Sequence, residues 1–134
     1  MNLSPSLGTI LVVDDTTAIL AMTEAMLNRH GYTVIAVADG RTAIGLLETS
    51  HDLRIDLVLL DVVMKDMTGP ETASEIRRLR PGLPVVFMTG FPEHSELLQL
   101  QDESVIRKPF SSLTLVRQIR ASLGGGKAAS AASE

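Results

Sequence analysis

Four short apolar runs in this sequence each lead into polar residues that suit phosphoryl chemistry. Asp14 and Asp15 follow the first run, Asp61 the second, Thr89 the third and Lys108 the fourth. In an open parallel α/β sheet, ligands bind in the crevice beyond the carboxyl ends of the strands. If the four runs are strands of such a sheet, their polar ends meet at one edge. The pattern therefore predicts a single active site there.

Three carboxylates at one sheet edge need a positive partner. At about 4 Å and an effective dielectric constant of about 20, each pair of negative charges costs roughly 4 kcal/mol. A hard divalent cation answers this need, Mg²⁺ above all, because it binds one or two carboxylates, keeps water and leaves a position for a phosphoryl oxygen. Lys108 supplies a further positive charge. We therefore expect Mg²⁺ as the cofactor of this site.

Each of these signals also has an ordinary structural explanation. A pair of aspartates after a strand is often a turn or a helix cap, and Thr89-Gly90 and Lys108-Pro109 are sequences that turns and loops commonly contain. Their joint occurrence at the ends of four strands is what favours a functional site.

The segments that must position these residues alternate between strands and helices. Valine, isoleucine and leucine without alternation are typical of strands buried on both faces, and we expect strands over residues 10–13, 33–37, 57–60, 85–88 and 105–106. Apolar residues at helical spacing predict helices over residues 18–29, 41–48, 72–79, 93–100 and 111–123, with Thr16 or Thr17 as the first N-cap. The alternation predicts a doubly wound, parallel α/β sheet with helices on both faces.

The composition is that of one globular domain with an aliphatic core. The chain has 134 residues, 45% of them hydrophobic and 3% aromatic, so base stacking on aromatic side chains is disfavoured. It has no cysteine, so oxygen or imidazole must bind any metal. The formal net charge of -4 gives no global attraction for nucleic acid or anionic lipid.

The chain divides into an N-terminal arm (residues 1–8), a folded domain (9–123) and a flexible tail rich in glycine, alanine and serine (124–134). Its first residues lack the basic start and apolar stretch of a signal peptide, and no apolar run approaches the length of a membrane span. We therefore expect a cytoplasmic protein with no membrane insertion and no direct binding to nucleic acid.

As an ordered set, these motifs resemble the receiver domain of two-component response regulators, over about residues 9–123. The matching motifs are Ile10-Leu-Val-Val-Asp-Asp15, Asp56-Leu-Val-Leu-Leu-Asp61 with Met64 and Gly69 after it, Val85-Val-Phe-Met-Thr89-Gly90, and Lys108-Pro109-Phe110. The resemblance implies a flavodoxin-like (βα)5 fold with strand order 2-1-3-4-5. The 67–71 and 80–84 stretches further resemble receivers fused to hybrid histidine kinases, so both a stand-alone regulator and an excised receiver remain open.

The resemblance also implies a role for each polar residue. Asp61 would accept the phosphoryl group, and Mg²⁺ would be bound by Asp14, Asp15, Asp61 and the backbone carbonyl of Val63. Two further residues would contact the phosphoryl group, Thr89 by a hydrogen bond and Lys108 by its charge. The donor would be a histidine kinase or a histidine phosphotransfer protein, and the signal would pass to a downstream protein or a fused module. The chain would thus be a signalling switch and not an enzyme.

Three features depart from the family pattern. Val105 stands where the family usually has tyrosine or phenylalanine, so no ring can flip there when Thr89 moves. The segment between Thr89 and Lys108 is shorter than usual by about one helical turn. Lys65 replaces a common proline, which either loosens the loop or adds positive charge near the site. We therefore expect residues 89–101 to carry the conformational change, with Phe91 as the aromatic side chain that relocates.

Other functions fit less well. A haloacid-dehalogenase-like phosphatase needs a second aspartate two residues after its nucleophile, where this chain has Val63. A pseudo-receiver that only binds partners is disfavoured because all five polar positions are present. A flavodoxin-like cofactor carrier is disfavoured because no glycine-rich phosphate loop follows the first strand.

Overall fold

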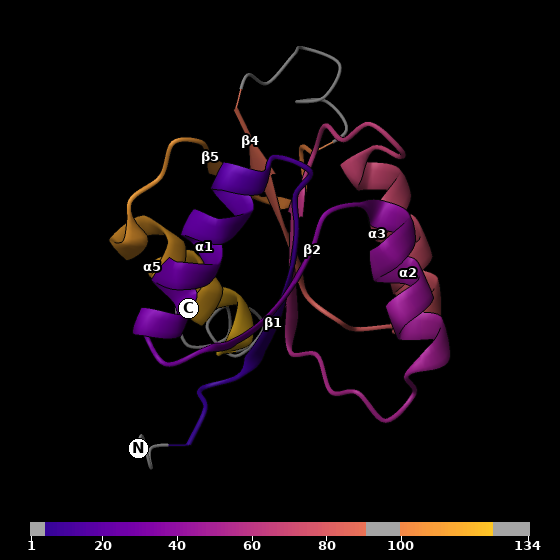
Figure 1. Ribbon diagram of the computed structural model, residues 1–134, viewed down its shortest axis with the longest axis horizontal. Helices are drawn as coiled ribbons and strands as arrows, with labels where there is room; N and C mark the ends of the chain where they lie inside the picture. Colours follow the sequence, from indigo (N-terminus) through magenta and orange to yellow (C-terminus); the bar gives the residue numbers. More distant parts are fainter. Residues whose placement is uncertain (1–4, 91–99, 125–134) are drawn as a thin grey trace.

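The computed structural model, which describes residues 5–90 and 100–124, contains a five-stranded parallel sheet (Figure 1). The strands are β1 (Thr9–Val13), β2 (Thr33–Val37), β3 (Leu57–Asp61), β4 (Val85–Thr89) and β5 (Ser104–Arg107). Their order across the sheet is β2-β1-β3-β4-β5, and every neighbouring pair is parallel. The predicted fold class and strand order are confirmed.

Helices cover both faces of the sheet. They are α1 (Thr17–Arg29), α2 (Gly40–Thr49), α3 (Gly69–Leu79) and α5 (Ser112–Leu123). Figure 1 shows α1 and α5 on one face and α2 and α3 on the other. The helix expected over residues 93–100 lies outside the described residues except for Leu100, as does most of the proposed tail. In the part of the chain that is described, no helix is long and apolar enough to cross a membrane.

The central strands β1, β3 and β4 are apolar except at one end, because each contributes side chains to two cores. In β1, Leu11 and Val13 pack with α2 and α3, whereas Ile10 and Val12 pack with α1 and α5. The same alternation continues through β3 and β4, whose residues are all buried. Successive side chains of a strand point to opposite faces, so a strand covered on both sides has no polar positions until it ends. The first polar side chains therefore appear at the strand ends.

Helix α3 begins three residues earlier than the apolar spacing predicts. Thr68 and Glu71 form a capping box, in which the Thr68 side chain accepts from the Glu71 N–H and the Glu71 side chain accepts from the Thr68 N–H. Pro70 lies in the first turn, where its missing N–H has no helical partner to lose. The cap therefore sets this helix start, which the apolar pattern does not reach.

Candidate functional site

The predicted polar residues lie at the carboxyl edge of the sheet. Asp14 follows β1, Asp61 is the last residue of β3, Thr89 is the last residue of β4 and Lys108 follows β5. Strands β1, β3, β4 and β5 are consecutive neighbours in the sheet. Parallel strands that end together therefore bring these residues to one place, as the sequence predicts.

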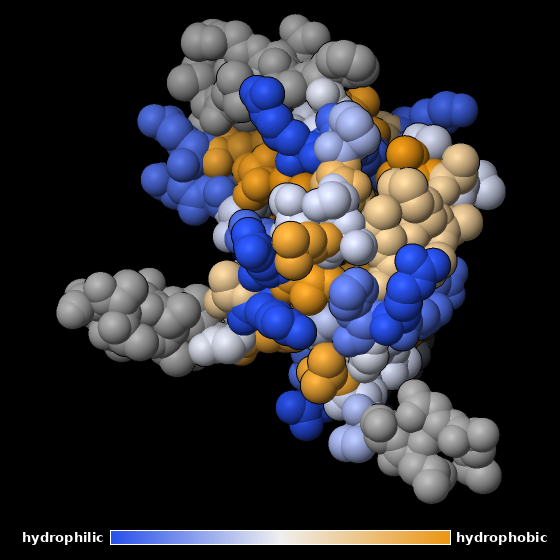
Figure 2. All heavy atoms as spheres, turned by 90° about the vertical axis from the view of Figure 1, so that its left-hand side faces the viewer, coloured by the Kyte–Doolittle hydropathy of each residue, from blue (hydrophilic) through white to orange (hydrophobic). Residues whose placement is uncertain are grey.

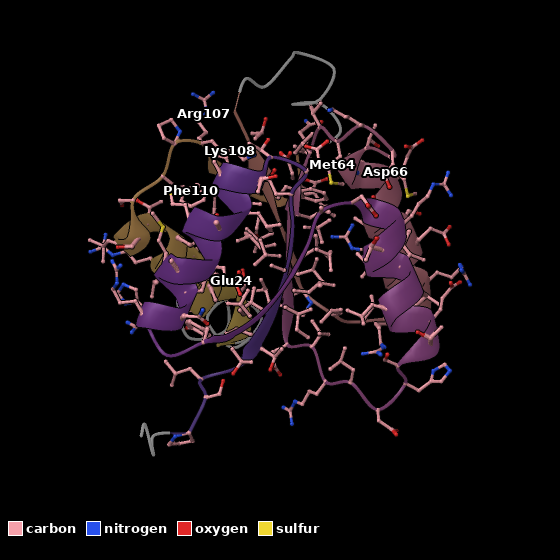
Figure 3. The ribbon with its side chains drawn as sticks, in the orientation of Figure 1. Glu24, Met64, Asp66, Arg107, Lys108 and Phe110 are labelled. Carbon is pink, nitrogen blue, oxygen red and sulfur yellow. The ribbon has the colours of Figure 1, made fainter. Side chains whose placement is uncertain are left out.

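Lys108 bridges two of the carboxylates. Its ammonium nitrogen lies 2.8 Å from Asp14 Oδ2 and 3.2 Å from Asp61 Oδ1. The Asp14 side chain is completely buried and that of Asp61 is 8% exposed. Buried charges need a partner of opposite sign, and the lysine supplies one between the two aspartates. In Figure 3, Lys108 lies at the same end of the molecule as Met64 and Asp66, which belong to the loop after β3.

Asp15 completes an acidic cluster that could hold a metal ion. One carboxylate oxygen from each of Asp14, Asp15 and Asp61 lies within 4.8 Å of the other two. Asp14 and Asp61 are buried and Asp15 is partly exposed, so the cluster opens toward solvent on the Asp15 side. All of these donor atoms are carboxylate oxygens, which hard divalent cations prefer.

Burial and charge both act on Asp61. The pKa of its carboxyl is raised to about 6, mainly by desolvation, and the negative charges of Asp14 and Asp15 act in the same direction. The charge of Lys108 and its hydrogen bond lower the pKa, but they do not outweigh burial. Asp61 is therefore still mainly ionised at neutral pH, although it takes up a proton more readily than a free aspartate.

The contacts with Asp14 and Asp61 raise the pKa of Lys108. Desolvation alone would lower the pKa of the ammonium group, but the hydrogen bond to Asp14 and the charges of Asp61 and Asp14 outweigh it and raise the pKa above its ordinary value. Lys108 is thus positively charged at neutral pH.

Thr89 lies beside this ion-pair network, 3% exposed, at the end of β4. Its main-chain carbonyl accepts a hydrogen bond of 2.8 Å from the Lys108 N–H, which ties the end of β4 to the residue after β5. Val63, expected to offer its carbonyl to a metal, lies two residues after Asp61 in an exposed position. The metal-binding role of Val63 stays a prediction.

Main-chain contacts around the acidic pair are not visible in the sequence pattern. Asp14 Oδ1 accepts from the Thr16 N–H over 2.9 Å, while the Thr16 side chain, at the expected N-cap of α1, makes no capping bond. Asp15 Oδ2 accepts from the Lys65 N–H over 2.9 Å. Asp14 thus bonds a main-chain donor as well as Lys108, and Asp15 bonds a main-chain donor in the loop after β3. The Lys65 side chain is exposed, and both expectations for Lys65, a looser loop or added positive charge near the site, stay predictions.

The face formed by α1 and α5 has a mixed surface. Figure 2 shows hydrophilic and hydrophobic residues interspersed on this face. Two of its large apolar side chains are exposed, Met22 on α1 and Leu113 on α5. Val105, on β5, is partly buried and packs against the core on the α2 and α3 side. Phe91, expected to carry the signal, lies outside the described residues.

Residues 10–120 match the protein family described as "Response regulator receiver domain". The transcriptional regulatory protein CpxR of Klebsiella pneumoniae is 35% identical over 119 residues, which cover 85% of this chain and 48% of that protein. The chain therefore spans about half the length of the curated relatives it matches.

Solved structures of receiver domains also match this chain. A CheY-like response regulator receiver domain protein from Methanospirillum hungatei JF-1 superposes with a TM-score of 0.80 at 30% identity, covering 89% of this chain and 95% of that one. The receiver domain of the hybrid histidine kinase CckA superposes with a TM-score of 0.73 at 28% identity, covering 87% and 99%.

Proposed function

The chain belongs to the family of response regulator receiver domains of two-component signalling, and from this premise we propose that it is a phosphorylation switch whose phosphoacceptor is Asp61. In the proposed reaction a carboxylate oxygen of Asp61 attacks the phosphorus of a phosphohistidine. The bond between phosphorus and the imidazole nitrogen breaks, an acyl phosphate forms, and the imidazole, protonated on its other ring nitrogen, leaves as neutral histidine. Water later hydrolyses the acyl phosphate, which releases inorganic phosphate and restores Asp61.

The observation that carries this proposal is the position of Lys108 between two buried carboxylates. Its ammonium group is 2.8 Å from Asp14 and 3.2 Å from Asp61, so a fixed positive charge stands beside the proposed nucleophile. A phosphoryl group on Asp61 would bring further negative charge to this position, where a preorganised cation stabilises it. Asp61 must attack as the anion, and a pKa of about 6 leaves most of it ionised at neutral pH.

The acidic cluster fits a divalent cation, and we propose Mg²⁺ as the cofactor. Asp14, Asp15 and Asp61 would hold it, because each offers a carboxylate oxygen within 4.8 Å of the other two. The backbone carbonyl of Val63 is a further proposed ligand. When bound, the ion would neutralise the oxygens of the transferred group. Thr89, at the buried end of β4, is the proposed hydrogen-bond donor to a phosphoryl oxygen.

The proposed donor is a histidine kinase or a histidine phosphotransfer protein. This proposal is supported by the family and by the similarity to the receiver of the hybrid histidine kinase CckA. The proposed output is a downstream protein or a fused module, in line with relatives that are named transcriptional regulators and are about twice as long. We propose no direct contact between this domain and nucleic acid.

The experiment is intact-mass spectrometry after incubation with acetyl phosphate and Mg²⁺. We expect the wild-type chain to gain one phosphoryl group, and the gain to be abolished in Asp61→Asn and by removing Mg²⁺ with EDTA. Asp52→Asn, an exposed aspartate remote from the cluster in the sequence, is the matched control and should label like the wild type. Equal labelling of Asp61→Asn would refute the assignment, and no labelling of a folded wild type by acetyl phosphate or by a phosphorylated kinase would favour the pseudo-receiver.

A further inference from the structure

The loop that follows the proposed phosphoacceptor contacts the acidic pair through its main chain. This β3–α3 loop (residues 62–68) places the Lys65 N–H 2.9 Å from Asp15 Oδ2, across 50 residues of sequence. The Lys65 side chain is exposed. The contact therefore depends on the amide of residue 65, whichever side chain that residue carries.

The amide of Lys65 is held in place by its neighbour. The Asp66 carboxylate accepts hydrogen bonds from the first turn of α2, 2.9 Å from the Arg41 N–H and 3.3 Å from the Gly40 N–H. Carboxylates are favourable at a helix N-terminus, where several N–H groups lack helical partners. Asp66 thus anchors the loop to α2 one residue after the amide that reaches Asp15.

The ends of the loop are fastened as well. The Gly69 N–H donates to the Val62 carbonyl over 2.7 Å, and Thr68 caps α3 through its capping box with Glu71. A loop fastened at both ends and in the middle presents the Lys65 N–H in one position. A donor that is already in place loses little conformational freedom when it binds its acceptor.

We propose that the main-chain amide of Lys65 is a positioning group that orients Asp15 for divalent-cation binding, with Asp66 as its anchor. The proposal rests on the function proposed above, since it concerns the same cation site. Asp15 is the most exposed member of the cluster and does not contact Lys108 among the described hydrogen bonds. An ordered donor on one of its oxygens limits the rotation of the carboxylate, as hydrogen-bonding partners of metal ligands generally do.

This arrangement needs a residue other than proline at position 65. Proline has no N–H to donate, so the residue that the family commonly carries here would remove this contact. Lys65 therefore gives the chain a means of holding Asp15 that the common family sequence lacks.

The test compares Lys65→Pro, which removes the N–H, with Lys65→Ala, which keeps it and removes only the ammonium group. Mg²⁺ is titrated while backbone amide shifts are followed by NMR. We expect Lys65→Pro to weaken Mg²⁺ binding about tenfold, the lower end of what partners of metal ligands contribute. Lys65→Ala should stay close to the wild-type dissociation constant. Raising Mg²⁺ should restore the phosphorylation rate of Lys65→Pro.

Two further measurements separate this role from a general distortion by proline. In an Asp15→Ala background, Lys65→Pro should weaken Mg²⁺ binding no further, because the two changes act through one contact. In the chain with Lys65 intact, Asp15→Ala should speed hydrogen exchange of the Lys65 amide. The Thr16 amide, which bonds Asp14, is the internal control and should keep its exchange rate. Asp66→Ala should also speed Lys65 exchange, and Asp66→Asn, which retains an acceptor oxygen, should do so less.

The outcomes distinguish this role from the function on which it rests. Equal dissociation constants for Lys65→Pro and Lys65→Ala, or an unchanged Lys65 exchange rate in Asp15→Ala, would overturn the positioning role alone. A folded wild type that binds no Mg²⁺ at the cluster would overturn the proposed cation site together with this role.

Discussion

Gly69 packs directly against the main chain of Asp61. A Cβ atom built on Gly69 would lie 2.5 Å from the Asp61 carbonyl oxygen and 2.8 Å from the Val62 Cα. Both atoms belong to the backbone, so no side chain can turn aside to make room. The start of α3 therefore approaches the end of β3 so closely that only glycine fits at position 69 without a shift of the backbone.

We predict that Gly69→Ala destabilises the fold and displaces Asp61. The added methyl group must push the backbone of residues 61 and 62 away, at a cost of about 2 kcal/mol in unfolding free energy. Phosphorylation of Asp61 should slow because its carboxylate moves from Lys108. Urea denaturation and the rate of mass gain with acetyl phosphate would measure both effects.

Gly45→Ala is the matched control, because a Cβ there meets nothing within 4 Å and the residue lies inside α2. Alanine should stabilise that helix by roughly 0.5–1 kcal/mol and leave phosphorylation unchanged. Similar stabilities for the two variants would contradict the close approach at Gly69.

We predict that Asp61→Asn stabilises the metal-free protein at neutral pH. The pKa of Asp61 rises from 3.8 to about 6 on folding, so the folded state holds the proton more tightly than the unfolded chain does. Stability is therefore lost as the pH rises from about 4 to about 6, by about 3 kcal/mol from this group. Asparagine has no charge to bury, so the variant should escape this loss.

Urea denaturation in EDTA from pH 4 to pH 8 measures the difference in unfolding free energy between Asp61→Asn and the wild type. We expect the difference to be small near pH 4 and to reach its plateau above pH 6. A difference that is the same at both ends would show that Asp61 titrates alike in the folded and unfolded chains.

We predict that Lys108→Met destabilises the metal-free protein and that Mg²⁺ reduces the deficit. The substitution leaves the carboxylates of Asp14 and Asp61 buried without their cation, at a cost of about 3 kcal/mol. A divalent cation at the cluster would compensate part of the lost charge. Thermal unfolding with and without Mg²⁺ measures the loss of stability and its reduction by the ion. Arg107→Met, which removes an exposed cation from β5, is the control. If Mg²⁺ left the loss of stability in Lys108→Met unchanged, the ion would not compensate for the missing charge, and this prediction would be wrong.

We predict that phosphorylation moves Thr89 and leaves Val105 in its rotamer. Val105 is paired with Phe87 across β4 and β5 and packs against the core, and it has no ring to fill space that Thr89 vacates. Methyl and amide NMR of the free form and of a beryllofluoride complex should show changes concentrated in residues 89–101. Changes confined to α5, with residues 90–100 silent, would exclude this route.

The sheet and the charged part of the site could be predicted from the sequence because both follow from side-chain type. Apolar runs without alternation indicate strands buried on both faces, and polar residues directly after or one position beyond each run mark its end. Asp14, Asp61 and Lys108 are found together for this reason. The positions of α1 and α5 followed in the same way from apolar residues at helical spacing.

The contacts of the β3–α3 loop could not be predicted because they depend on main-chain groups. Every residue except proline has an N–H, so nothing in the sequence indicates that the Lys65 N–H bonds Asp15. The contact of Asp66 with α2 could not be predicted either, because Asp66 accepts a hydrogen bond from Gly40, which lies 26 residues earlier in the chain. Helix-capping patterns identify a cap within a few residues of its own helix, as at Thr68, and miss one that the fold brings from elsewhere.

The ion pair between Asp14 and Lys108 joins residues 94 positions apart, close to the two ends of the folded chain. Contacts of such long range carry a large entropic cost of loop closure, so they form late unless other contacts bring the two segments together. During synthesis, a chain that has emerged only through β4 holds all three carboxylates of the cluster but not Lys108, which pairs with two of them. The electrostatics of the site are therefore complete only when β5 joins the sheet, so the proposed phosphoryl transfer would require the folded domain with β5 in place.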